Sequence, residues 1–345
     1  MAALTTRDAT LPPTYSQALE SLALGPLWTA LHQLLPGERT TRAVPHAWSW
    51  HAIRPLLHEA ARLVPIEQAE RRVLVLENPG LTSTYAITAT LYAGLQIILP
   101  GEAAPSHHHT PAALRFVVEG RGAYTTVEGV KCAMEPGDLI ITPPMRWHDH
   151  GHEGTEPVVW LDGLDIPIVR SFDASWSSRM RPAQPPTTAT DSSQDELTAA
   201  GLVPRRSRYE DTDYPQVRWP WSTVRPALAA MAASASSDQP VILRYVNPRT
   251  GAPPLATMGA EAQWLRPGER TRPDRRTTSA VFHVIEGRGE SRVGDQTLAW
   301  ERGDTFVVPP WHWITHDNPT GAPACLFQFN DEPAVRALGL FQEET

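Results

Sequence analysis

The sequence predicts an all-β protein made of two copies of one β-barrel unit, preceded by a helical segment. Three observations predict this fold class. Short runs rich in β-branched residues and bounded by Gly or Pro, such as RRVLVLENPG, ALRFVVEGRGAYTTV and DLIITPP, fill much of the chain after Val73. Proline makes up 34 of the 345 residues, which argues against an all-helical protein. Several motifs also recur once, in the same order.

Helical periodicity is confined to the first part of the chain and to one later segment. Residues 14–35 carry leucines at helical spacing up to Pro36-Gly37, and residues 47–64 form a similar pattern with Pro55 near its start. A further short helix is predicted at 221–235. These segments suit a helical extension and a connection between the barrels.

The repeat supports the two-barrel prediction. The matches keep one order along the chain: LPGE at 99–102 with RPGE at 266–269, VEGRG at 118–122 with IEGRG at 285–289, PGD at 136–138 with RGD at 302–304, Pro143-Pro144 with Pro309-Pro310, and Trp147 with Trp313. Two unrelated β segments with similar turn chemistry would share single motifs. A series of ordered matches indicates duplication of one unit.

The predicted organisation has four parts. Residues 1–70 form a helical N-terminal region, 71–173 the first barrel, 174–240 a linker with a helical connection, and 241–345 the second barrel. The stretch 174–198 is rich in Ser, Thr and Pro and is predicted to be a linker or mobile loop.

Composition excludes several classes of function. The formal charge of −8 and the pI of about 5.9 disfavour a nucleic-acid partner. No apolar run approaches the ~20 residues of a membrane helix, and the N-terminus lacks a secretory pattern. Two cysteines, Cys132 and Cys325, predict reduced thiols in a cytoplasmic protein. The only lysine, Lys131, disfavours Schiff-base chemistry.

Histidines cluster in the first barrel, where six of the 13 fall between residues 107 and 152. On a strand, His107 and His109 point to one side and His108 to the other. The segment from Gly137 onward brings His148 back on a neighbouring strand. Three converging imidazoles suit a divalent ion such as iron, manganese, nickel or zinc. The alternative is a surface histidine tract without function.

The spacing of these residues resembles the two motifs of the cupin superfamily. The matching residues are Gly101, His107, His109, Gly120, Gly137, Asp138, Pro143 and His148. The resemblance implies a bicupin, with two double-stranded β-helix (jelly-roll) barrels. Ala113 stands where the family usually has a glutamate ligand, so three histidines without a carboxylate are expected to hold the metal. Such a site favours an anionic, chelating substrate.

Longer strings resemble the gentisate 1,2-dioxygenase family, which includes salicylate and 1-hydroxy-2-naphthoate 1,2-dioxygenases. They are ERRVLVLENPG at 70–80, LYAGLQ at 91–96, HTPAALRFVVEG at 109–120 and WHDHG at 147–151. The resemblance implies a homotetrameric non-haem Fe(II) enzyme, of extradiol type, that opens the C1–C2 bond of a 2-hydroxybenzoate with O2. Gentisate giving maleylpyruvate is the first expectation. Salicylate, its nitro, halo or amino derivatives and 1-hydroxy-2-naphthoate are alternatives, and the pathway, catabolic or biosynthetic, stays open.

The resemblance also implies roles for further residues. Arg115 is expected to pair with the substrate carboxylate, because a guanidinium binds a carboxylate through two hydrogen bonds. His150 is expected to move a proton, with Asp162 orienting it or serving structure alone. Substrate-binding positions are Arg71, Tyr92, Gly94 and Gln96. The choice between Arg71 and Arg72 stays open, and Gly94 either leaves room for a ring substituent or serves close packing.

The second barrel is expected to lack a metal. At the repeat offset Asp274 replaces His107, Arg276 replaces His109, and Ile314 replaces His148, while His316 matches His150. Two other classes of function remain for the whole chain: a cupin enzyme that does not cleave rings, such as an isomerase or a diketone or thiol dioxygenase, and a small-molecule sensor or storage barrel.

Overall fold

The chain divides into two units, and both barrels lie in the second. The computed structural model describes residues 11–179, 186–191, 213–236 and 239–345. Unit 1 spans Met1–Arg42 and unit 2 spans Ala43–Thr345. Within the described ranges, no helix has the length and apolar character needed to span a membrane.

The helical segments follow the predicted order with one correction. Residues 14–35 form two helices instead of one, α1 (Pro13–Ser21) and α2 (Leu27–Leu34). Residues 22–26 separate the two helices, and Pro26, which lacks the amide hydrogen that a continuous helix needs, is the N-cap of α2. The helix predicted at 47–64 is present as α3 (Trp50–Leu63), followed by the single turn α4 (Ile66–Ala69).

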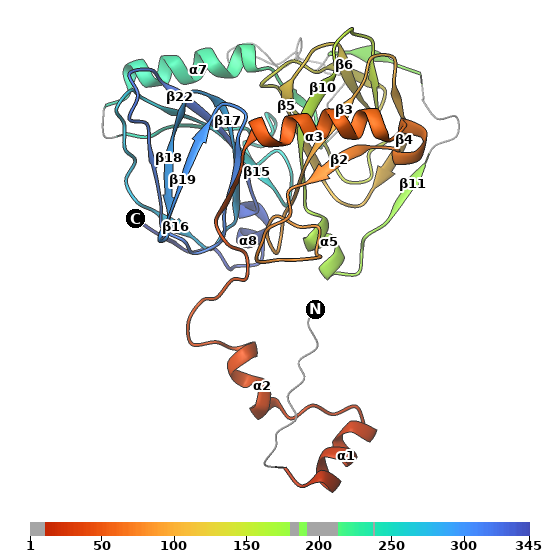
Figure 1. Cartoon of the computed structure of the whole chain (residues 1–345), viewed down its shortest axis with the longest axis vertical. Helices are drawn as coiled ribbons and strands as arrows, with labels where there is room; N and C mark the ends of the chain where they lie inside the picture. The colour runs from red at the N-terminus through yellow and green to blue at the C-terminus, as the bar shows by residue number, and fades with distance from the viewer. Residues whose placement is uncertain (1–10, 180–185, 192–212, 237–238) are drawn as a thin grey trace. The chain divides into compact units, whose positions relative to one another are not determined.

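The first barrel consists of two six-stranded sheets (Figure 1). Its inner sheet has the order β13 (Arg218–Trp219), β8 (Leu139–Thr142), β5 (Ala113–Glu119), β10 (Val158–Leu164), β3 (Tyr92–Ile98) and β2 (Arg72–Val75). Its outer sheet has the order β11 (Ser177–Arg179), β4 (Ala103–His109), β9 (His148–His152), β6 (Ala123–Val127), β7 (Val130–Ala133) and β12 (Ala189–Thr190). The helix α5 (Ile166–Ser171) follows β10.

The second barrel repeats this design. Its inner sheet has the order β1 (His46–Trp48), β20 (Thr305–Val308), β17 (Ala280–Glu286), β22 (Ala324–Asn330), β15 (Gly259–Leu265) and β14 (Val241–Arg244). Its outer strands are β19 (Gln296–Glu301), β18 (Arg288–Val293) and β21 (Ile314–Asp317), with β16 (Arg275–Arg276) paired to β23 (Glu343–Glu344). The helix α8 (Glu332–Ala337) follows β22. The all-β bicupin prediction is confirmed.

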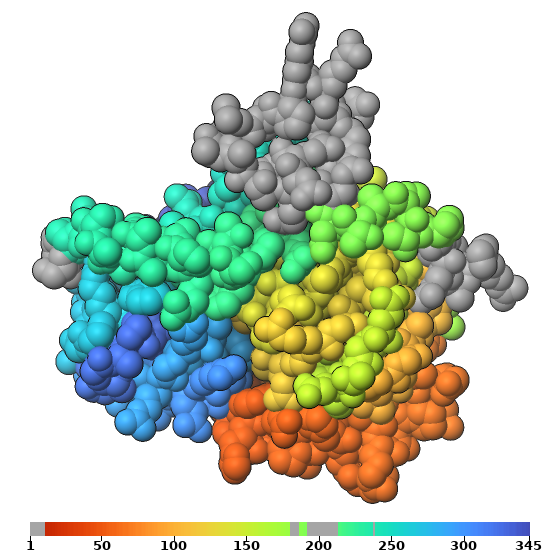
Figure 2. Space-filling model, turned by 90° about the horizontal axis from the view of Figure 1, so that it is seen from above, coloured from red at the N-terminus to blue at the C-terminus, as the bar shows by residue number. Residues whose placement is uncertain are grey.

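The two inner sheets share one hydrophobic core, and the barrels lie side by side (Figure 2). Along β5 the side chains alternate, so Phe116 faces the shared core while Arg115 faces the interior of the first barrel. Phe116 stacks on Phe327 of β22, with ring centroids 4.1 Å apart. The core therefore fixes which side chains of β5 reach the barrel interior.

Strand registers confirm the duplication. His107 pairs with His148 in the first barrel, and Asp274 pairs with Ile314 in the second. Both barrels carry a bulge near the end of the equivalent strand, β5 or β17, and the strand is followed by Gly120 or Gly287, each with φ near +85°. A Cβ on Gly120 would lie 2.1 Å from the carbonyl oxygen of Pro157, so the recurring glycine has a steric cause.

Two helices connect the barrels reciprocally. The amide of Trp50 at the start of α3 donates to Asp304 of the second barrel at 2.8 Å, while α3 packs on β2 and β3 of the first. The arrangement is reversed for the helix α7 (Trp221–Ser234), predicted at 221–235. The amide of Trp221, at the start of this helix, donates to Asp138 of the first barrel at 2.9 Å. The body of α7 packs on β14 and β15 of the second barrel, and Figure 1 shows it lying over that barrel.

Two buried aspartates join the barrels in the same reciprocal way. Asp165 accepts hydrogen bonds from the amide of Ala112 at 2.8 Å and from the hydroxyl of Thr257 in the second barrel at 2.5 Å. Asp331 accepts from the amide of Ser279 at 2.8 Å and from the hydroxyl of Thr90 in the first barrel. Each barrel thus supplies one carboxylate and one hydroxyl to the contact.

Part of the predicted linker belongs to the first barrel. The strands β11, β12 and β13 all lie within 174–240 and pair with β4, β7 and β8. The loop prediction for 174–198 is therefore wrong for β11 and β12. Residues 180–185 and 192–198 lie outside the described residues. The boundaries at 70 and 240 stay predictions.

We expect the substitution Asp331→Asn to change how stability depends on pH. Burial raises the pKa of Asp331 from 3.8 to about 6, so the folded chain holds this proton more tightly than the unfolded chain. The resulting stabilisation is complete below about pH 4 and is lost as the pH rises through about 6. Across this window the free energy of unfolding should fall by about 3 kcal/mol more in the wild type than in Asp331→Asn.

Urea titrations between pH 4 and pH 7 measure this difference. The exposed Asp295 provides the matched control, and the difference between wild type and Asp295→Asn should stay flat. A flat difference for Asp331→Asn as well would contradict the expectation.

Candidate metal centre

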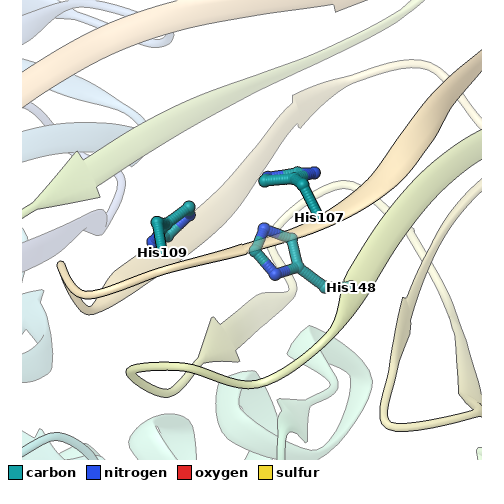
Figure 3. A group of neighbouring side chains, drawn as sticks. All are labelled: His107, His109 and His148. Atoms are coloured by element: carbon teal, nitrogen blue, oxygen red, sulfur yellow. The ribbon is translucent and has the colours of Figure 1, made fainter. Parts of the chain in front are cut away.

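Three histidines from two paired strands meet inside the first barrel. His107 and His109 alternate with His108 along β4, and His148 is the first residue of β9 and the register partner of His107. Figure 3 shows the three rings pointing toward one another. One ligand atom from each lies within 4.8 Å of the others, a spacing that allows one metal ion to bind all three.

Hydrogen bonds to the main chain set the orientation of each ring. The Nδ1 atoms of His107, His109 and His148 lie 3.0, 2.7 and 2.9 Å from the carbonyl oxygens of Pro105, Pro111 and Arg146. A carbonyl oxygen only accepts, so each Nδ1 carries the hydrogen and each Nε2 keeps its lone pair. Nε2 of His148 is buried without a protein partner, as a metal ligand awaiting its ion would be.

The three imidazoles are neutral at pH 7. Burial, together with the neighbouring Arg71, lowers the pKa of His107 to about 2, and burial lowers the pKa of His109 to about 4. Burial also lowers the pKa of His148 well below its ordinary value. Metal binding therefore requires no loss of protons from these rings.

Two guanidinium groups face the triad. Arg71 contacts Nε2 of His107, whereas Arg72 points away, pairing with Glu102 and donating to the carbonyl oxygen of Ala61 at 2.9 Å. Arg71 therefore faces the triad and Arg72 does not, while a substrate-binding role for Arg71 stays a prediction. Arg115 is 3 % exposed, and its charge lowers the pKa values of all three histidines.

One buried carboxylate offsets these two cations. Nε of Arg115 lies 3.5 Å from Oδ1 of Asp162, its register partner on β10, and Nη1 donates to the hydroxyl of Thr142 at 2.5 Å. Burial raises the pKa of Asp162 to about 6, against the opposing effect of Arg115 and Arg71, and burial lowers the pKa of Arg115 to about 10. All three groups are charged at pH 7, so these side chains carry a net positive charge.

His150 is held by a hydroxyl group. Its Nδ1 lies 2.9 Å from Oγ1 of Thr125, and its Nε2 is buried without a protein partner. Asp162 instead accepts from Nε1 of Trp160 at 3.0 Å and pairs with Arg115. The expectation that Asp162 orients His150 is therefore wrong, because Asp162 already serves these two groups and Thr125 holds the imidazole.

The predicted pocket residues of β3 share one face of the strand. Tyr92, Gly94 and Gln96 alternate along β3, and Gly94 is the register partner of Asp162. A Cβ on Gly94 would lie 2.6 Å from Cγ1 of Val73 and 2.9 Å from the hydroxyl oxygen of Tyr92. The space beside Gly94 is already filled, so close packing explains this glycine better than room for a substituent.

Sequence reasoning missed the two threonines that hold site residues. Thr125 and Thr142 lie on β6 and β8, and neither stands in a histidine or arginine motif. The repeat carried one available signal, because Ser291 occupies the position of Thr125 and bonds Nδ1 of His316 at 2.7 Å.

Comparison with known proteins gives one consistent result. A Cupin domain family model matches residues 94–164 and 263–329, one match in each barrel. A gentisate 1,2-dioxygenase of Ralstonia sp is 44% identical over 337 residues, covering 96% of this chain and 94% of that protein. A 5-aminosalicylate 1,2-dioxygenase of Comamonas sp is 36% identical, covering 93% of this chain and 87% of that protein.

A solved structure agrees in fold. The salicylate 1,2-dioxygenase from Pseudoaminobacter salicylatoxidans, in an adduct with gentisate, matches with a TM-score of 0.90 and 32% identity. The match covers 99% of this chain and 96% of that one, so the likeness includes both barrels.

We expect His148→Ala to abolish tight metal binding, because two imidazoles on one strand cannot replace a third from β9. Metal analysis of wild-type protein should give about one divalent ion per chain. The matched control is His108→Gln, since His108 stacks on Trp147 with ring centroids 3.9 Å apart, on the face of β4 opposite to His107 and His109. Two tight ions per wild-type chain, or full metal content in His148→Ala, would contradict the assignment.

Proposed function

This chain belongs to the gentisate 1,2-dioxygenase family of cupin enzymes, and from this premise we propose that it uses Fe(II) and O2 to open gentisate to maleylpyruvate. The chain is an aromatic ring-cleaving 1,2-dioxygenase. The bond broken joins the ring carbons that bear the carboxylate and the hydroxyl. The observation that supports this most is the combination of a neutral three-histidine centre with the buried Arg115, the partly buried Arg71 and a single buried carboxylate.

The residues of the centre fit one iron ion per chain. His107, His109 and His148 present lone pairs at Nε2, and none of the three would have to lose a proton. Bound there, Fe(II) would supply open positions for a chelating hydroxy acid and for O2, together with the redox chemistry that couples the two. Three neutral ligands leave the charge of the ion uncompensated, and this favours an anionic substrate.

The substrate carboxylate is the expected partner of Arg115. The guanidinium of Arg115 donates to the hydroxyl of Thr142 and lies 3.5 Å from the carboxylate of Asp162. It therefore keeps N–H groups that can donate to a substrate carboxylate. Arg71 adds a second positive charge beside His107. Asp162 acts as a positioning residue, because it holds Arg115 from the neighbouring strand.

His150 is the proposed proton carrier. Thr125 holds Nδ1, and the ring centroid of His150 lies 5.8 Å from that of His148. Burial and both arginines keep its pKa well below the ordinary value. The neutral ring is able to accept a proton at Nε2 from a substrate hydroxyl and to return it later. Tyr92, Gly94 and Gln96 would shape the wall of the substrate pocket.

The assembly and the cellular setting are also part of the proposal. The proposed assembly is a homotetramer, on the resemblance to the family alone. Both cysteines are free thiols, which suits the cytoplasm.

The substrate assignment predicts a clear order of activities. Gentisate, salicylate and 1-hydroxy-2-naphthoate carry carboxylate and hydroxyl on adjacent carbons, whereas 3-hydroxybenzoate and catechol do not. We expect turnover of the first group, with gentisate fastest, because only these compounds chelate a metal and also pair with Arg115. Oxygen uptake and identification of the products by mass and NMR measure this. Efficient opening of catechol or 3-hydroxybenzoate, without turnover of the ortho-hydroxy acids, would reject the assignment.

We expect Arg115→Gln to lower both stability and turnover. The substitution leaves Asp162 as a buried, unpaired carboxylate, at a cost of about 3–5 kcal/mol. Arg115→Gln/Asp162→Asn should recover most of this stability, while kcat/KM stays at least about tenfold below that of Asp162→Asn alone. Equal activity in the double variant and in Asp162→Asn would show that Arg115 has only a structural role.

A further inference from the structure

The second barrel contains a cavity where the first has its metal centre. The cavity has a volume of about 470 Å³, a size that accommodates a one-ring molecule. Asp274, Arg276 and Ile314 line it at the positions that His107, His109 and His148 occupy in the first barrel. The pairing of Asp274 with Ile314 reproduces that of His107 with His148, so the equivalence holds in the structure.

A fixed cation takes the place of the metal in this cavity. Arg276 has three carboxylates near it, and its shortest ion pair joins Nε to Oε1 of Glu343 at 2.7 Å. Asp274 and Glu332 lie at 4.0 and 3.8 Å. Glu343 belongs to β23, a strand of two residues that pairs with β16. The carboxylate of Glu343, from β23, therefore pairs with the guanidinium of Arg276 in the cavity.

We propose that the second barrel binds a small aromatic monocarboxylate, whose carboxylate pairs with Arg276 in place of Glu343. Phe282, Ile314 and Val308 form an apolar wall for the body of such a ligand. Glu261 and Gln328, both 8 % exposed and hydrogen-bonded to each other, line the same cavity. The carboxylate of Glu261 disfavours a second negative charge and accepts a hydrogen bond from a ligand hydroxyl.

In this arrangement Glu343 of β23 competes with the ligand carboxylate for Arg276. Glu343 is 36 % exposed at its side chain, so its pairing with Arg276 is accessible to solvent and can exchange. Its neighbour Glu344 pairs with Arg275 instead, at 2.8 Å. Glu343 and Glu344 thus have different partners, and of the two arginines only Arg276 lines the cavity.

Equilibrium dialysis of the holoenzyme with labelled benzoate tests the proposal. Benzoate lacks the ortho-hydroxyl needed to chelate a metal, so its binding to the first barrel is disfavoured. Glu343→Gln should tighten benzoate binding several-fold because the competing charge is gone. Arg276→Gln should weaken it about tenfold or more. Glu344→Gln is the matched control and should bind benzoate like the wild type.

Each outcome decides the question. Opposite shifts in Glu343→Gln and Arg276→Gln support the site. Unchanged affinity in both variants, or no binding to Glu343→Gln at millimolar benzoate, overturns it. Gentisate turnover, measured on the same preparations, reports the first barrel separately. The inference therefore stands or falls independently of the proposed reaction.

Discussion

The antiparallel pairing of β4 with β9 is the constraint on which the metal centre depends. His107 and His148 are register partners, and His109 lies two residues further along the same face of β4. The register shifts between Ala104 and His107, so an irregularity in the ladder brings the histidines into place. A slip by one residue would turn His107 and His109 outward and bring His108 in.

The two barrels show which features belong to the fold and which to the chemistry. A hydroxyl group holds Nδ1 of a buried histidine in both, Thr125 with His150 and Ser291 with His316. This pair therefore belongs to the repeated scaffold and does not by itself indicate catalysis. What differs is the surrounding set of side chains, because Phe282 stands in the second barrel where the first has Arg115. The role proposed for His150 therefore rests on its neighbours and not on the histidine-hydroxyl pair itself.

Local patterns in the sequence predicted the fold and the triad, because strand alternation and recurring turns depend on neighbouring residues. The choice between Arg71 and Arg72 depended on where β2 begins, which tertiary pairing decides. The partner of His150 was equally hidden, since Thr125 lies on another strand. The reciprocal helices did leave a signal: WSWHAIRP at 48–55 and WPWSTVRP at 219–226 share two tryptophans and an Arg-Pro pair. In both, the arginine pairs with a glutamate that ends the matching strand, Arg54 with Glu119 and Arg225 with Glu286.

The two barrels also differ in the balance of charged side chains inside them. In the second barrel, Arg276 has three carboxylates of the chain within 4.0 Å, so the protein itself supplies its counter-charge. In the first barrel, two arginines face one carboxylate, and Arg71 contacts the nitrogen of His107 that a metal would bind. A metal ion at that nitrogen would repel the guanidinium. An anion held by both cations removes the conflict, so the site becomes electrostatically complete only with a negatively charged substrate in place.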